Sequence, residues 1–444
     1  MKKLERRAIL CLLLAAVLFL GVGFFCYRFV TQGPDWALFY ANQSIYEDGH
    51  LANGNIYDVD GDLLIKSDDG EFSYSDDADV RCATVHAVGD MGGNISTAAL
   101  SAFRSDIVGY SLLTGTYSLG GKGNDIKLTI DDEVSKAAYY ALGSYDGCVG
   151  VYNYETGEIL CMVSSPGFDP AYPPASGEEE SGMYLNKVLS SRMIPGSIFK
   201  LVTSAAAIEN YEGLDDWYYQ CDGTMKINNE EITCTHAHGR VDFEEALAVS
   251  CNCGFGDLTI KVGAETMKEY VKKLGLTKSY NIDGVRNLEG SYEFPDDAAL
   301  NLAWAGIGQY NDELNPCSML VYMGAIANGG EAAKPKLKHT AIDMTPKTGQ
   351  LIEPETADKL TKMMKKAVEE TYGEWNFPGL DIYAKSGTAE VEGREPNAWF
   401  SGFIKNDNTP YAFIVCVENG GYGSSVAGPI ANQVMQAVLE RVND

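Results

Sequence analysis

One serine and one lysine stand three residues apart in a segment that can hold an activated nucleophile. Ser197 and Lys200 belong to the run 195–200, and Ser197 is the only serine followed by a lysine at that spacing. Positions i and i+3 share one face of a helix. A serine hydroxyl needs a base to become nucleophilic, and a buried lysine can be neutral near pH 7. The pair predicts Ser197 as nucleophile and Lys200 as base, although such a spacing also arises by chance in a long chain.

The residues around this pair predict a buried helix that starts near Ser197. Pro195 and Gly196 are typical of a helix start, because proline presets φ and has no N–H to waste in the first turn. The segment 201–208 is mostly apolar, which favours a helix inside the protein. Lys200 should therefore lie about one turn from the Ser197 hydroxyl, away from water.

Two more short groups follow along the chain. Ser250-Cys251-Asn252 comes after a predicted helix at 243–249, and Lys385-Ser386-Gly387-Thr388 comes where a strand should begin near Ile382. Each group alone is common in ordinary proteins. A Ser-x-x-Lys, a Ser-x-Asn and a Lys-Ser/Thr-Gly element in this order form the signature of penicillin-binding proteins and serine β-lactamases.

On these motifs the sequence resembles a class B penicillin-binding protein, a peptidoglycan D,D-transpeptidase. The resemblance covers nearly the whole chain and includes the turn at 154–159, the segment 164–170 and the strand at 398–403. Residues 55–61 resemble the membrane-proximal hairpin of the family but lack the arginine often found before it. Ser386 stands where threonine is commoner and keeps the hydroxyl.

The resemblance implies a role for each catalytic position. Ser197 would attack the carbonyl between two D-alanines while Lys200 accepts its proton. Ser250 would relay a proton to the leaving amine, and Asn252 would hold the substrate amide. Lys385 would keep Lys200 neutral by like-charge repulsion and attract the anionic peptide.

The resemblance also implies the groups that bind the substrate. The hydroxyls of Ser386 and Thr388, on either side of Gly387, would bind the terminal carboxylate. The backbone N–H groups of Ser197 and Thr388 would form an oxyanion hole. The partners implied are peptidoglycan stem peptides and β-lactams, which resemble D-Ala-D-Ala and should acylate Ser197.

Two alternative functions share all three motifs. A membrane-anchored serine β-lactamase would need a route for water to the acyl-serine, and it seldom carries an uncleaved anchor. A β-lactam sensor would need a cytoplasmic output domain, whereas about seven residues precede the predicted anchor. The sequence therefore favours the transpeptidase.

Three cysteines and a histidine lie between the first two motifs: Cys221, Cys234, His238 and Cys251. Three thiols and an imidazole can form a closed structural zinc site, and the family resemblance adds weight to this prediction. A disulfide, Cys221–Cys234 or Cys234–Cys251, is the alternative in an oxidising compartment, and buried free thiols are a third. No cofactor is expected for catalysis.

Composition and charge bound the remaining possibilities. The chain has 444 residues, 45% of them hydrophobic, and a formal net charge of −28. This length suggests two or three domains, and the acidity argues against a nucleic-acid partner, which requires clustered Lys and Arg.

An apolar run at 8–27 predicts a transmembrane anchor, because about 20 apolar residues cross a bilayer. Basic residues in the tail 1–7 predict a cytoplasmic N-terminus, with the catalytic region outside the membrane. A small β-rich membrane-proximal region is expected at 28–124 and the transpeptidase domain at 125–444. No glycosyltransferase domain fits before residue 125, so a membrane glycan polymerase is the expected partner.

The order of predicted elements positions the motifs. Strand patterns at 126–130, 148–154 and 159–163 precede a mostly helical region at 197–323, and strands return at 399–404 and 411–417. A helix is predicted at 131–142, and Pro429 is expected to open a last helix that ends at Arg441. Strands, helices and then strands again indicate an α+β fold with an antiparallel sheet, flanking helices and a helical subdomain.

Overall fold

The structure is a computed structural model that describes residues 2–37, 53–68, 71–108, 110–111, 116–117, 123–227, 230–340, 345–406 and 408–443. The chain forms two compact units. One consists of residues 1–56, 65–73 and 103–126, and the other of residues 57–64, 74–102 and 127–444. Every predicted site residue belongs to the second unit. The predicted domain boundary after residue 124 stays a prediction.

The N-terminal segment is one long helix, α1 (Lys2–Ala37). Its stretch Glu5–Gln32 is long and apolar enough to cross a membrane, and it contains the predicted run 8–27. Large apolar side chains of this stretch, including Leu18 and Phe19, are exposed in the chain alone. Such an exposed apolar surface is stable in the hydrocarbon interior of a lipid bilayer.

A small sheet follows α1 in sequence. Strands β1 (Ile56–Tyr57), β2 (Leu63–Asp68) and β3 (Glu71–Tyr74) belong to a four-stranded sheet of order β3-β2-β1-β6, in which β1 and β2 are neighbours, so the predicted hairpin is confirmed. Asp58 organises the connecting turn, because its Oδ1 accepts the backbone N–H groups of residues 60, 61 and 62. The strand predicted at 126–130 is shorter than expected, because β6 spans only Ile126–Lys127 and Leu128 forms an isolated bridge with Lys338.

The second unit is built on a five-stranded antiparallel sheet of order β15-β16-β17-β7-β8. Its strands are β7 (Gly147–Asn153), β8 (Ile159–Ser165), β15 (Ile382–Ala389), β16 (Asn397–Ile404) and β17 (Tyr411–Val417). β7 pairs with β17, so strands from before and after the helical region share one sheet. The α+β fold with an antiparallel sheet is thereby confirmed.

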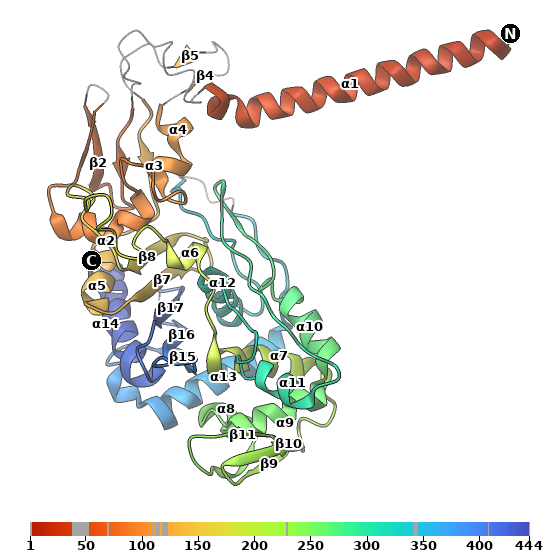
Figure 1. The fold of residues 1–444 in the computed structure, drawn as a ribbon, viewed down its shortest axis with the longest axis vertical. Helices are drawn as coiled ribbons and strands as arrows, with labels where there is room; N and C mark the ends of the chain where they lie inside the picture. The colour runs from red at the N-terminus through yellow and green to blue at the C-terminus, as the bar shows by residue number, and fades with distance from the viewer. Residues whose placement is uncertain are drawn as a thin grey trace. The chain divides into compact units, whose positions relative to one another are not determined.

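Helices cover both faces of this sheet (Figure 1). On one face lie α5 (Asp132–Leu142) and α14 (Gly423–Asn443), which share a core with Val149 and Val151. Between these valines, Gly150 faces α12 (Pro316–Ala327) on the opposite side, where a Cβ would lie 3.4 Å from Leu320. Because both faces are covered, β7, β8, β16 and β17 bury nearly every residue rather than alternate ones.

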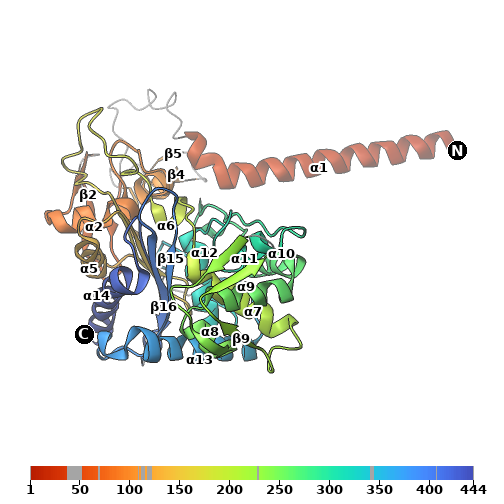
Figure 2. The same cartoon turned by 60° about the horizontal axis from the view of Figure 1, so that its bottom comes forward.

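The helical subdomain lies beside the β15 edge of the sheet in both views (Figures 1 and 2). Its helices are α7 (Lys200–Asn210), α8 (Phe243–Ala248), α9 (Asn252–Val262), α10 (Ala264–Lys273) and α11 (Ala299–Ala305). Four short strands between α7 and α8 were not predicted: β9 (Tyr218–Cys221), β10 (Thr224–Ile227), β11 (Glu230–Thr233) and β12 (Gly239–Asp242). They pair as β9-β12 and β10-β11.

The prediction that Pro429 opens the last helix was wrong. Helix α14 begins at Gly423, and Pro429 lies inside it. A Cβ on Gly423 would come within 2.2 Å of the Gly387 carbonyl oxygen, so the helix starts in direct contact with the sheet. Pro429 correctly indicated a helix in this region. The position where the helix starts depends on the close packing of Gly423 on the sheet, which the sequence pattern does not show.

Candidate active site

Ser197 and Lys200 lie where a 3-10 turn, Gly196–Phe199, passes into helix α7. Lys200 Nζ lies 3.1 Å from Ser197 Oγ, and Lys200 is 0% exposed. The predicted helix is therefore present, but its α-helical part begins at Lys200 and the serine stands in the tighter turn before it. The turn keeps the serine half-buried at the surface of a cavity while the lysine is fully enclosed.

Gly196 allows the serine turn to approach strand β15. Its φ is +55°, and a Cβ would lie 2.7 Å from the Thr388 carbonyl oxygen. A left-handed φ without a side chain is the conformation that glycine adopts at little cost. The sequence therefore needs glycine here to hold Ser197 next to the Lys-Ser-Gly-Thr segment.

Ser250 connects two helices in a strained conformation. It follows α8, which an Asp242–Glu245 capping box starts, and it precedes α9. Its φ of +55° is unusual for a residue with a side chain and costs about 1–2 kcal/mol. Such strain clusters at functional sites, where the surrounding structure enforces it.

The Lys200 amine is the common partner of the first two motifs. It lies 2.7 Å from the Ser250 carbonyl oxygen, 3.1 Å from Ser250 Oγ and 2.7 Å from Asn252 Oδ1. Burial, and then the charge of Lys385, lower the pKa of Lys200 to about 7. Near pH 7, the Lys200 amine can therefore be neutral in a large share of the protein molecules, and a base must be neutral to accept a proton.

Lys385 approaches the same serine from strand β15. Its Nζ lies 3.0 Å from Ser250 Oγ and 2.9 Å from the Ser386 carbonyl oxygen, and the side chain is 0% exposed. Burial lowers the pKa of Lys385 to about 7. The hydroxyl of Ser250 therefore stands between two buried amines, which suits a group that passes a proton.

The rest of the third motif follows along β15. Gly387 packs against the serine turn, where a Cβ would lie 2.9 Å from the Pro195 carbonyl oxygen. Thr388 Oγ1 accepts the backbone N–H of Gly423 at 3.3 Å. The two hydroxyl-bearing residues, Ser386 and Thr388, both line the cavity.

This cavity has a volume of about 470 Å³ and gathers the three motifs. Ser197, Ser250, Asn252, Ser386 and Thr388 line it, while Lys200 and Lys385 lie buried behind the serines. The residues that the sequence prediction missed on its wall include Thr233, Thr235, His236, Trp304, Tyr372 and Tyr422. Only Thr235 and His236 carried a signal, since they stand between two of the predicted metal ligands.

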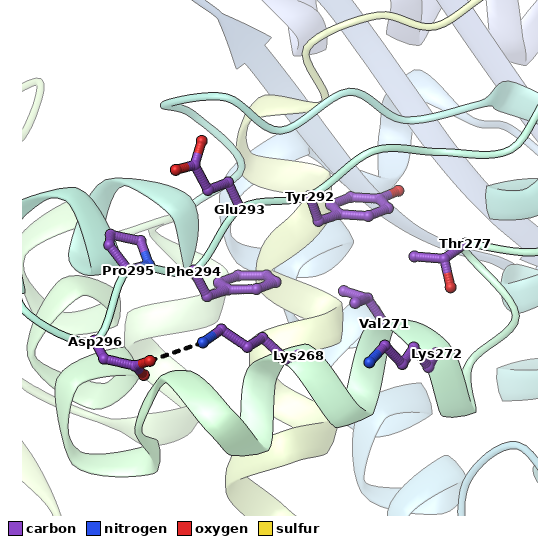
Figure 3. A pocket seen from close by; sticks show the side chains of 9 residues that line it. All are labelled: Lys268, Val271, Lys272, Thr277, Tyr292, Glu293, Phe294, Pro295 and Asp296. Carbon is purple, nitrogen blue, oxygen red and sulfur yellow. Dashed lines mark hydrogen bonds and ion pairs between the residues drawn. The ribbon is translucent and has the colours of Figure 1, made fainter.

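A second cavity, of about 430 Å³, lies between α10 and the segment before α11 (Figure 3). Lys268 forms an ion pair with Asp296 at 2.9 Å on its wall. Tyr292, another wall residue, stacks on Phe199 with ring centroids 5.5 Å apart. None of the predicted catalytic or substrate-binding residues lines this cavity, so the first one is the candidate active site.

The cysteine–histidine cluster is gathered beside the second motif. The ligand atoms of Cys221, Cys234, His238 and Cys251 all lie within 4.8 Å of one another. The cysteines are free thiols, so neither predicted disulfide is formed. Cys253 lies close as well, with its Sγ 3.4 Å from Cys234 Sγ.

The spacing of these atoms fits a tetrahedral zinc site. Cys221 Sγ is 3.7 Å from Cys234 Sγ and 3.5 Å from His238 Nδ1, and Cys234 Sγ is 3.8 Å from Cys251 Sγ. Zn–S bonds of about 2.3 Å and a Zn–N bond of about 2.0 Å at tetrahedral angles give edges of about 3.8 and 3.5 Å. Backbone N–H groups of Asn252 and Cys253 also point at Cys234 Sγ, which favours a thiolate there.

Comparisons with known proteins identify one family. The family model for the penicillin binding protein transpeptidase domain matches residues 147–436, more than half of the chain. The chain is 27% identical to peptidoglycan D,D-transpeptidase PbpA of Mycobacterium tuberculosis over 361 residues, 72% of this chain and 73% of that protein. It is 29% identical to stage V sporulation protein D of Bacillus subtilis over 357 residues, 71% of this chain and 54% of that protein.

Solved structures share the fold. A ceftriaxone acyl-enzyme complex of penicillin-binding protein A from M. tuberculosis has a TM-score of 0.77 at 24% identity, covering 87% of this chain and 98% of that one. Pseudomonas aeruginosa PBP2 has a TM-score of 0.73 at 23% identity, covering 87% and 96%.

Proposed function

The chain belongs to the penicillin-binding protein transpeptidase family, and we propose how its residues divide the work of peptidoglycan D,D-transpeptidation. The activity is that of an acyl-serine enzyme that cross-links stem peptides and that β-lactams block covalently. The observation that carries the assignment of roles is the placement of one buried amine, Lys200 Nζ, within hydrogen-bond reach of Ser197, Ser250 and Asn252.

The first half-reaction forms the acyl-enzyme. Neutral Lys200 takes the proton of Ser197 Oγ, and the oxygen attacks the carbonyl carbon between two D-alanines. The backbone N–H groups of Ser197 and Thr388 hold the oxygen that becomes negative, which is worth about 2.7–4 kcal/mol per donor in comparable sites. Ser250 passes a proton to the departing D-alanine amine, so the peptide bond breaks as the ester forms.

The substrate is held by the groups around the nucleophile. The carboxylate of the terminal D-alanine binds the hydroxyls of Ser386 and Thr388 next to the charge of Lys385. Asn252 Nδ2 positions the amide group of the peptide substrate. In the second half-reaction an amine of a neighbouring stem peptide loses its proton to Lys200, attacks the ester and releases Ser197.

The test is acylation by a fluorescent penicillin, followed by mass spectrometry of the labelled peptide. The label is expected on Ser197, and Ser197→Ala should fold normally and carry none. Covalent labelling of the Ser197→Ala protein would overturn the assignment. The lifetime of the adduct separates the related activities, because an adduct lost within seconds would indicate a β-lactamase and one that lasts for hours a transpeptidase or sensor.

We propose that Cys221, Cys234, His238 and Cys251 hold a structural zinc ion. Zinc would supply a fixed tetrahedral link between β9, the segment after β11 and the start of α9, with no part in the bond-forming steps. Metal analysis of protein purified without chelator should find one zinc per chain, with these thiols unreactive until the metal is removed. Metal-free protein with the same thiol reactivity and melting temperature would contradict this.

We also propose that α1 is a membrane anchor with its N-terminus in the cytoplasm. Lys2, Lys3, Arg6 and Arg7 precede the apolar stretch, and basic residues favour the cytoplasmic side. The catalytic unit then lies outside the membrane. A membrane glycan polymerase is the partner that we propose, because cross-linking requires newly made glycan strands. Protease accessibility in intact spheroplasts tests the orientation, and co-purification of the full-length chain tests the partner.

A further inference from the structure

Strand β15 carries the third motif at the edge of the five-stranded sheet. It is the first strand in the order β15-β16-β17-β7-β8, so within that sheet it pairs with β16 on one side only. Side chains two positions apart on a strand lie on the same face. Ser386 and Thr388 follow this alternation, and both line the catalytic cavity. They therefore begin a row of polar side chains along the cavity wall.

Glu390 continues this row by one step. It comes directly after Ala389, the last residue of β15, and it lines the same cavity as Ser386 and Thr388. The residue is exposed. None of the ion pairs between residues that the structure describes involves Glu390. Its carboxylate is therefore accessible to a ligand that enters the cavity.

The proposed mechanism sets the direction in which a donor peptide runs along this row. Its terminal carboxylate binds the hydroxyls of Ser386 and Thr388. The carbonyl oxygen of the bond that breaks belongs to the preceding residue and binds the Thr388 backbone N–H. The peptide therefore runs from its C-terminus near Ser386 toward Glu390. Because an extended chain advances about 3.3 Å per residue, the residue before the two D-alanines comes to the level of Glu390.

A stem peptide carries a cation that can meet this carboxylate. In the second half-reaction a stem peptide supplies an amine, so stem peptides of this kind have a side chain that ends in an amino group. Such a group is protonated at neutral pH, because its pKa is about 10.4. The donor does not use its own amine in the reaction and presents it as an ammonium group. Lys385, which attracts the donor carboxylate, precedes the row, and Glu390 ends it.

We propose that Glu390 is a specificity-determining residue whose carboxylate binds the side-chain ammonium group of the residue that precedes the two D-alanines of the donor. The inference rests on the proposed function, which sets the direction of the donor along β15. The cavity wall then matches the charges of the donor, with Lys385 next to the terminal carboxylate and Glu390 next to the ammonium group. A donor without this ammonium group still reaches Ser197 but lacks the contact with Glu390.

The test compares two synthetic donors on the full-length chain. Both end in D-Ala-D-thiolactate, a thioester analogue of D-Ala-D-Ala with a free carboxylate. The residue before this end is lysine in one donor and norleucine in the other. The measured quantity is the ratio of their second-order acylation constants at Ser197, lysine over norleucine. We expect a ratio of about five in the wild-type chain, the upper range for an exposed ion pair.

Glu390→Gln should lower this ratio to about one, because glutamine keeps the size of the side chain and removes its charge. An exposed substitution of this kind has little effect on stability, so the variant is expected to fold. Glu390→Lys should bring the ratio below one, because two like charges then meet. A third donor with glutamate at the same position should acylate Glu390→Lys faster than the lysine donor does.

Two other acids between β15 and β16 are the controls. Glu392 is exposed and is not among the described residues that line the cavity, so Glu392→Gln should leave the ratio at about five. Glu395 lines the cavity but does not continue the row of Ser386 and Thr388. Glu395→Gln should therefore lower the ratio less than Glu390→Gln does, which separates a direct contact from the general negative charge of the wall.

The outcomes separate this inference from the function on which it rests. A wild-type ratio of about one, or a ratio that stays at about five in Glu390→Gln, overturns the role of Glu390. An equal loss in Glu392→Gln or Glu395→Gln has the same meaning, and so does a ratio above one in Glu390→Lys. Failure of both donors to acylate Ser197 in the wild-type chain overturns the proposed function itself, and the inference with it.

Discussion

The backbone N–H of Asn252 donates to Cys234 Sγ at 3.1 Å, which joins the second motif directly to the cysteine–histidine cluster. The Asn252 side chain continues this link in two directions. Its Nδ2 donates to the Thr233 carbonyl oxygen at 2.8 Å, and its Oδ1 lies 2.7 Å from Lys200 Nζ. The strand that brings Cys234 to the cluster therefore also sets the position of the Asn252 amide against the general base.

Loss of the Cys234 ligand is expected to disturb catalysis through Asn252. Cys234→Ser should lower the bound zinc and reduce the second-order acylation constant by about 10²-fold, the cost of moving a positioning group by about 1 Å. Cys82→Ser is the matched control, since Cys82 lies far along the chain from the cluster. Zinc-free Cys234→Ser protein that is acylated at the wild-type rate would show that the cluster does not position Asn252.

Lys200→Arg should be nearly inactive although it keeps a positive charge. Arginine cannot lose its proton at accessible pH, so it cannot accept the Ser197 proton. The acylation constant should fall by about 10²–10⁴-fold, the usual contribution of a general base. Lys261→Arg, at an exposed position that pairs with Asp257, should acylate normally. Near-normal acylation by Lys200→Arg would remove Lys200 from the role of base.

The acylation rate should rise with pH through about 7. The pKa of Lys200 is lowered to about 7 by burial and by Lys385, and in the proposed mechanism the neutral form is the base. Below this value the rate should fall about tenfold per pH unit, because the neutral fraction falls by that factor. A rate that is flat from pH 5 to 8 would contradict a lysine base with this pKa.

Removing the neighbouring charge should move this profile. In Lys385→Gln the like charge is gone, so the pKa of Lys200 should increase and the rising limb should shift to higher pH. The rate at every pH will also be lower, since Lys385 attracts the substrate carboxylate. The position of the limb, rather than its height, is the measurement, and a shift to lower pH would contradict the proposed repulsion.

The motifs and the order of elements were enough to predict the sheet and the site. Strand patterns stand before and after the helical region, and β7 pairs with β17 as that order of elements predicted. Ser197, Ser250 and Lys385 could be grouped from the sequence because each is part of a short motif with a known spacing.

The residues that the sequence did not reveal are those whose role depends on long-range contacts. Tyr372 precedes the third motif by 13 positions, and a π-helical turn brings its hydroxyl back to Ser386. The short strands β9 to β12 span only four residues each, so the alternation of exposed and less exposed side chains in most of them is a brief signal between longer helical patterns. The spacing of motifs and the periodicity of apolar residues in the sequence do not reveal such contacts.

Gly196→Ala should separate the nucleophile from the third motif. The added Cβ would lie 2.7 Å from the Thr388 carbonyl oxygen, in a backbone conformation with φ of +55°, so the serine turn and β15 must move apart. We expect the acylation constant to fall by about 10²-fold and the free energy of unfolding to fall by more than the 1–2 kcal/mol of backbone strain alone.

Gly182→Ala is the matched control, because Gly182 has φ of +87° with no atom within 4 Å of the added Cβ. It should lose stability by strain alone and acylate normally. Equal stability losses in both variants, with normal acylation in Gly196→Ala, would mean that the close approach of the turn to β15 does not hold Ser197 in place.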